Sequence, residues 1–145
     1  MAASGYSGTP LVTKIGIKPG HRVRFPHRPV DWDLPGLPDE AVVDDAPGAT
    51  TGTTGATTPA DVTVAFYRAH ADLVAEAAGL AEDLADHAML WIAWPRRAAG
   101  HTSDITENAL RDLFLPLGVV DVKVAALGED WSGLKFVRRK ELRTN

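Results

Sequence analysis

The chain has 145 residues, of which 45% are hydrophobic and 23% charged, a composition typical of one folded globular domain. It contains no cysteine, which excludes disulfides, thiol nucleophiles and thiolate metal sites. A net charge of −4 gives no support to general nucleic-acid affinity, and no apolar run approaches the roughly 20 residues that a membrane span requires. The N-terminus lacks a secretory signal pattern, so we expect a cytoplasmic protein with neither a nucleic-acid nor a membrane partner.

The N-terminal part predicts small elements separated by turns. Thr9 suits a helix cap, Pro10 suits the first helical position, and Gly16 suits the stop. The turn Lys18-Pro19-Gly20 precedes a stretch that alternates polar and apolar residues, as a strand near a sheet edge does. The expected elements are a flexible segment over 1–8, a helix over 9–16, a strand over 22–25 and a short strand over 41–43.

Residues 44–60 are rich in Thr, Gly and Ala and lack apolar anchors, which predicts a mobile loop. Neither flank is large enough to fold alone with confidence. We therefore expect this loop to lie inside a single α/β domain over 9–142, followed by a short tail over 143–145.

Strands and helices alternate in the second half. Apolar residues recur at helical spacing between two apolar strands, and Asp104 with Glu107 resembles a capping box at the start of the next helix. This alternation predicts a mostly parallel sheet, closed by a C-terminal antiparallel hairpin. The elements are a strand over 62–66, a helix over 69–86, a strand over 89–94, a helix from about 105 to 117, and strands over 119–127 and 133–139.

Residues 15–23, IGIKPGHRV, resemble the helix, turn and first strand of class I methyltransferases. In that fold a helix precedes the first strand, and a helix with an antiparallel hairpin closes the sheet. The resemblance implies a Rossmann-like domain with three layers.

A second resemblance covers more of the chain. Three motifs are similar to those of a family of small actinobacterial proteins of unknown function: GYSGTPL at 5–11, LWIAWPR at 90–96 and WSGLKFV at 131–137. This resemblance implies the same fold and a cytoplasmic setting. It supplies no activity and no catalytic residues.

The loop after the first strand departs from the methyltransferase pattern. Such enzymes need glycines there, so that the backbone can approach the cofactor. Residues 25–31, FPHRPVD, contain no glycine, and their two prolines remove backbone N–H groups. We therefore expect no cofactor.

Basic and aromatic residues follow several strands of the predicted sheet. Ligands of open parallel sheets bind beyond the carboxyl ends of the strands, and guanidinium groups suit carboxylates and phosphates. The alternative is that Arg96 and Arg97 are solvated charges paired with Asp104 or Glu107. The candidate ligand-binding residues are His27, Arg28, Tyr67, Arg68, Trp94, Arg96 and Arg97.

These residues predict a non-catalytic binding or regulatory domain that recognises an anionic small molecule or an acidic protein surface. No catalytic triad and no histidine spacing typical of a metal site is found in the sequence. One alternative is a divergent enzyme that uses S-adenosylmethionine. Another is a structural protein that dimerises through its closing hairpin, and the choice between monomer and dimer stays open.

Overall fold

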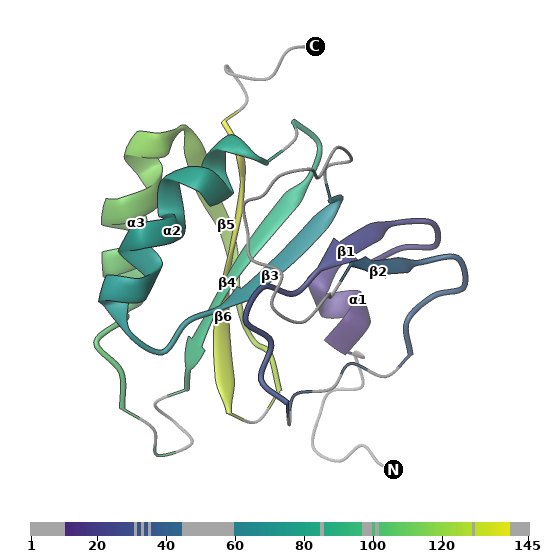
Figure 1. Cartoon of the computed structure of the whole chain (residues 1–145), viewed down its shortest axis with the longest axis horizontal. Coiled ribbons are helices and arrows are strands. Elements are labelled where there is room, and N and C mark those ends of the chain that lie inside the picture. Colours follow the sequence, from purple (N-terminus) through teal and green to yellow (C-terminus); the bar gives the residue numbers. More distant parts are fainter. Residues whose placement is uncertain are drawn as a thin grey trace.

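The structure, a computed structural model, is a mixed α/β fold with one six-stranded sheet and three α-helices among the residues it describes (Figure 1). The described residues are 11–30, 32, 34, 36–44, 60–84, 86–96, 100, 102–128 and 130–139. The segment expected to be flexible, the tail and nearly all of the low-complexity loop lie outside them. So does Arg97.

The strands form one open sheet in the order β2-β1-β3-β4-β6-β5. The first four are parallel, whereas β6 is antiparallel to both β4 and β5. The predicted mostly parallel sheet and C-terminal antiparallel hairpin are confirmed. The prediction that the hairpin closes the sheet is wrong, because the sheet is open and the hairpin forms one of its edges. The strands are β1 Arg22–Arg24, β2 Val42–Asp44, β3 Val62–Phe66, β4 Met89–Pro95, β5 Val119–Ala126 and β6 Trp131–Arg138.

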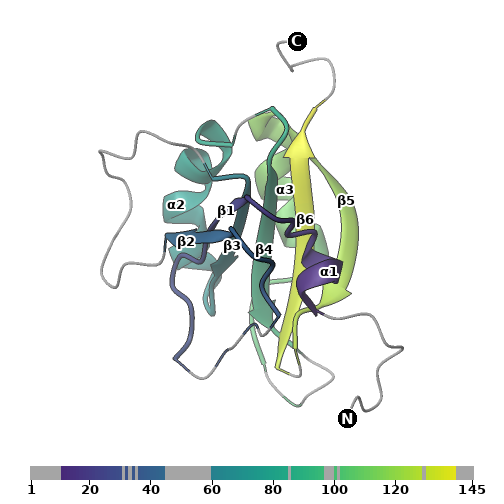
Figure 2. The ribbon, with the colours of Figure 1, turned by 90° about the vertical axis from the view of Figure 1, so that its right-hand side faces the viewer.

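The helices lie on both faces of the sheet (Figures 1 and 2). Helix α1, Leu11–Ile15, packs on one face, while α2, His70–Glu82, and α3, Glu107–Phe114, pack together on the other. Helix α3 continues into a single 3₁₀ turn, Leu115–Leu117.

Helix α2 ends four positions before the predicted residue 86. The amide of Leu84 turns back to the carbonyl of Ala81, which tightens the last turn. The guanidinium of Arg138 on β6 donates to the carbonyls of both residues. The end of this helix is therefore fixed by a strand more than fifty residues away, which local sequence does not show.

Strand β4 is buried on both faces, as its continuous apolar sequence predicts. Leu90, Ile92 and Trp94 belong to the core under α2 and α3, whereas Trp91 and Ala93 belong to the core under α1. The indole N–H of Trp91 donates to the carbonyl of Ile15 at 3.0 Å. This bond attaches the end of α1 to the centre of the sheet.

The start of α3 differs from the predicted capping box. Thr106 is the N-cap, and its hydroxyl accepts the amide N–H of Ala109 at 3.1 Å. The carboxylate of Asp104 instead accepts the amide N–H of His70 at 2.8 Å. Asp104 therefore satisfies the first turn of α2, a helix whose own cap residue, Ala69, makes no such side-chain bond.

Replacing Thr106 with alanine should lower the free energy of unfolding by about 1 kcal/mol, because the amide of Ala109 loses its acceptor. Urea denaturation measures the change. Thr106→Ser keeps the hydroxyl and should retain most of the stability. Equal losses in the two variants would contradict the assigned cap.

Candidate functional site

The carboxyl ends of β1, β3 and β4 lie at one end of the sheet, since these neighbouring strands are parallel. The described candidate residues lie near these strand ends, Trp94 within β4 and the others in the segments that follow β1, β3 and β4. The structure divides the six described ones among three local environments. They are a polar cluster at His27 and Tyr67, an aromatic cluster that carries Arg28 and Arg68, and a pocket at Trp94 and Arg96.

The polar cluster is built on Glu76 of α2. The hydroxyl of the buried Tyr67 donates to Oε1 of Glu76 at 2.6 Å. Nε2 of His27 lies 2.9 Å from the same oxygen, and the His27 ring meets the Tyr67 ring edge-on at 5.3 Å between centres. The prediction brought His27 and Tyr67 to one place, and Glu76 is the residue that joins them.

The contacts in this cluster change two pKa values. Burial, followed by the hydrogen bond to Glu76 and the charges of Glu76 and Asp72, raises the pKa of Tyr67 far above its ordinary value. Partial burial acts to raise the pKa of Glu76, but the hydrogen bonds from Tyr67 and His27 outweigh it and leave that pKa below its usual range. Tyr67 therefore stays a neutral donor, and Glu76 stays a carboxylate that accepts two bonds.

His27 has an unusual backbone conformation, with a φ of 63° in the left-handed region. The flanking backbone holds it there, because the amide of Arg28 bonds to the carbonyl of Phe25 and the amide of Phe66 bonds to that of Pro26. This turn directs the imidazole toward Glu76 of α2.

Aromatic side chains fill the space beyond β1 and β3 on the face that carries α1. The Trp32 ring contacts Phe25 and Phe66, and Phe66 contacts Trp131, with ring centres 4.9 to 5.6 Å apart. The indole N–H of Trp32 donates to the carbonyl of Leu127 at 2.9 Å. These side chains are buried, so protein fills the space between them on this face of the sheet.

Two predicted arginines lie on this aromatic cluster. The guanidinium carbon of Arg68 is 4.9 Å from the ring centre of Trp131, and that of Arg28 is 5.6 Å from the ring centre of Phe25. Stacking of this kind orders an exposed cation over an aromatic face. Neither Arg28 nor Arg68 lines the pocket that contains Arg96, although the carbonyl of Arg68 accepts the hydroxyl of Ser103, which does line it.

An open pocket of about 460 Å³ lies beyond β4. Trp94 and Arg96 line it, which is the association that the sequence predicted for these two residues. The buried Trp94 forms an apolar wall, and the amide of Arg96 is fixed by the carbonyl of Asp130 at 2.8 Å. The other walls include Ser103, Thr106, Arg111 and Ser132.

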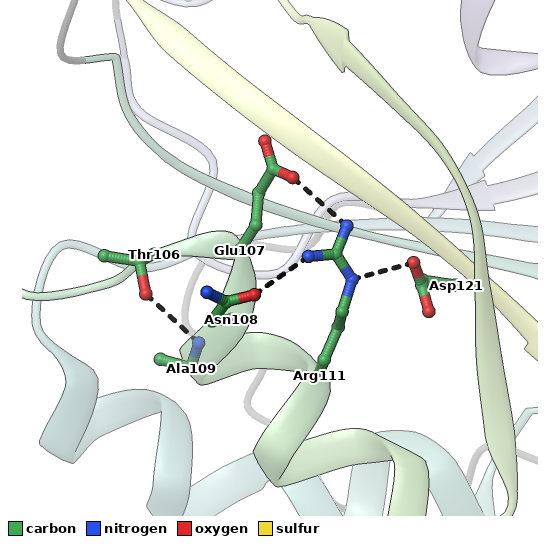
Figure 3. A network of polar contacts seen from close by, with 6 residues as sticks. All are labelled: Thr106, Glu107, Asn108, Ala109, Arg111 and Asp121. Carbon is green, nitrogen blue, oxygen red and sulfur yellow. Dashed lines mark hydrogen bonds and ion pairs between the residues drawn. The ribbon is translucent and has the colours of Figure 1, made fainter.

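The first turn of α3, drawn in Figure 3, also lines this pocket, through Thr106, Glu107 and Asn108. Its first intrahelical bond runs from the amide of Leu110 to the carbonyl of Thr106. The amide N–H groups of Glu107 and Asn108 come before that bond and have no acceptor within the helix. They give the N-terminus of α3 a partial positive charge, and both residues line the pocket.

Arg111 is held rigidly beside this turn. Its guanidinium donates to Asp121 of β5 at 2.9 Å, to Asn108 at 3.1 Å and to Glu107 at 3.1 Å (Figure 3). The bond to Asp121 raises the pKa of Arg111. Glu107 pairs with Arg111, and Asp104 accepts the amide N–H of His70, so the described contacts of these two carboxylates do not include the suggested pairing with Arg96, which has other contacts.

Sequence reasoning missed Glu76, Trp32 and Arg111. Glu76 stands next to the buried Ala77 on α2, so helical periodicity would have placed it beside the apolar stripe. Trp32 lies in a proline-rich segment without periodicity, and Arg111 finds Asp121 only across the turn to β5. The sequence around Trp32 and Arg111 therefore does not indicate which distant residues they contact.

The chain matches no protein-family profile, and no curated protein is significantly similar to it. The resemblances to methyltransferases and to the actinobacterial family stay predictions from the sequence. None of the described helices is both long and apolar enough to cross a membrane. Within the same residues, no three metal-ligating side chains gather at one place.

Proposed function

We propose that this protein is a non-catalytic, cytoplasmic binding domain that recognises an anionic small molecule in the pocket beyond β4. The architecture is Rossmann-like with three layers, and its ancestry lies with the small actinobacterial proteins whose motifs it resembles. The helix before β1 and the helix and antiparallel hairpin after β4 support this layout.

The observation that carries the proposal is the lining of one pocket by Arg96 together with the first turn of α3. A guanidinium and the amides of a helix N-terminus both favour carboxylate or phosphate oxygens. Arg111 also lines the pocket, where Glu107 and Asp121 balance its charge and three acceptors fix its position. Trp94 offers the apolar wall that a planar or aliphatic part of the ligand requires.

A thermal-shift panel of nucleotides, acyl-CoA, phosphosugars and carboxylates tests this proposal, at low and high salt. Arg96→Ala should weaken binding of any ligand found by about tenfold or more, since a charged hydrogen bond is worth about 1.5–3 kcal/mol. Lys18→Ala is the control, because Lys18 lies in an exposed turn before β1 and outside the pocket lining. Unchanged affinity in Arg96→Ala, or no ligand across the panel, would refute the proposal.

The order of the elements favours a second candidate, a divergent enzyme dependent on S-adenosylmethionine. The residues do not fit that cofactor, because the loop after β1 lacks glycine and Trp32 is buried against Phe25 and Phe66 beyond the strand ends. Calorimetry with millimolar cofactor decides the question. A saturating isotherm would support the hypothesis of an enzyme that uses S-adenosylmethionine, and a flat trace would refute it.

A further inference from the structure

The edge strand β5 is an eight-residue strand with one neighbour among the described strands, β6 (Figure 2). Half of the backbone N–H and C=O groups of such a strand point away from its neighbour and can pair with another chain. At the opposite edge, β2 has only three residues. Strand β5 therefore offers the longer edge.

Two apolar side chains of β5 are exposed in the centre of this edge. Val122 is 53% exposed and Val124 49%. Val124 pairs with Leu134, which lies in the core under α2 and α3, so Val124 extends that core outward on the same face. An added strand would cover it.

The opposite face of the same segment is basic. Lys123 pairs directly with Lys135 of β6, and its amine donates to the carbonyl of Lys14 in α1 at 3.4 Å. Burial, and then the charge of Lys123, lowers the pKa of Lys135. Like charges placed opposite each other on neighbouring strands destabilise a sheet. The lysine pair is therefore a local concentration of positive charge on a protein whose net charge is −4.

From these placements we propose that β5 is a docking edge for an extended acidic segment of a partner protein, which adds to the sheet as a seventh strand. Carboxylates at alternate positions of the segment lie beside Lys123 and reach toward Lys135 and Lys14. Apolar side chains at the positions between them cover Val124. Backbone hydrogen bonds supply affinity, and the two faces supply selectivity.

The irregularity between Asp121 and Lys123 sets the limits of the docking edge. Asp121 is already bound by Arg111, so the side of the strand before Val122 is engaged by α3. Regular pairing to β6 resumes at Lys123 and continues to Ala126. An added strand therefore pairs with residues 123–126. Of these only Ala126 lies opposite a residue of the pocket, Ser132, so Lys123→Glu and Arg96→Ala test the two sites separately.

A blocked eight-residue peptide of alternating Glu and Val is the probe, with a Lys and Val peptide as its control. We expect amide chemical-shift changes along β5, and slower hydrogen exchange of edge amides within 123–126, with the acidic peptide only. Lys123→Glu should weaken binding by about tenfold or more, since it converts an attraction into a repulsion. Lys18→Glu makes the same charge change at an exposed turn before β1 and should bind as the unmodified protein does.

Four results would overturn the proposal. They are no shift at millimolar acidic peptide, equal binding of the basic peptide, shifts without protection of the edge amides, and protection that appears with protein concentration in the absence of peptide. The last, accompanied by a dimer in light scattering, would assign the edge to a second copy of this chain.

Discussion

Replacing Trp32 with alanine should lower the free energy of unfolding by about 3–5 kcal/mol, the usual cost of truncating a buried tryptophan. Trp32 is 7% exposed, although it belongs to no helix or strand. Its ring contacts Phe25 and Phe66, and its indole N–H is the donor to Leu127. The substitution leaves a cavity and an unsatisfied carbonyl at once.

Trp32→Phe separates these two effects. Phenylalanine keeps an aromatic ring against Phe25 and Phe66 but cannot donate to Leu127, so it should cost about 1–3 kcal/mol. Denaturation by urea, followed by the fluorescence of the other tryptophans, measures both variants. A loss below about 1 kcal/mol in Trp32→Ala would mean that the ring is not buried.

The Trp32 variants also bear on the proposed function. Removing one ring of the aromatic cluster does not supply the glycines that the loop after β1 lacks. Trp32→Ala should therefore gain no affinity for S-adenosylmethionine. Ligands of the pocket beyond β4 should bind Trp32→Ala with unchanged affinity, because Trp32 is absent from the lining of that pocket.

Strands with strong local patterns were predicted well from the sequence. Strand β3 occupies the predicted 62–66, and the continuous apolar run of β4 is buried on both faces as expected. The boundaries that were wrong depend on distant partners. Arg138 fixes the end of α2, and Asp104 serves α2 although it lies just before α3.

The sequence predicted the end of the sheet at which the candidate residues lie, but not which of them share a local environment. Strand direction alone places residues 27, 67 and 94 at one end of the sheet, which is correct. Side-chain direction then decides which layer each residue near a strand end faces, because alternate residues of a strand face opposite layers. Tyr67 and Trp94 face the core under α2 and α3, whereas Phe25 and Phe66 face α1. Arg68 stacks on Trp131 of the core under α1, whereas Arg96 lines the pocket with Trp94, and these contacts depend on packing that the sequence does not show.

Above pH 10, Tyr67 should make the folded protein progressively less stable. Its pKa is raised on folding, so the unfolded chain loses the phenolic proton first, at an ordinary pKa near 10. Stability from this group is fully present below that pH and falls as pH rises, with a slope approaching about 1.4 kcal/mol per pH unit.

Tyr67→Phe lacks the ionisable group. The variant should therefore be the less stable of the two proteins at neutral pH and the more stable at high pH. At pH 7 the variant should be less stable by about 1 kcal/mol, because Glu76 loses a hydrogen bond. By pH 12 the unmodified protein should have lost about 2.7 kcal/mol through Tyr67, and the variant should then be the more stable of the two. Urea denaturation at a series of pH values locates the crossing.

A direct titration isolates the group. The chain has two tyrosines, so in Tyr6→Phe the phenolate absorbance reports Tyr67 alone. Folded Tyr6→Phe should show no phenolate near pH 10, and the signal should appear only as the protein unfolds. A phenolate that forms near pH 10 with the fold intact would mean that Tyr67 does not donate to Glu76. The polar cluster that joins α2 to the loop after β1 would then depend on His27 alone.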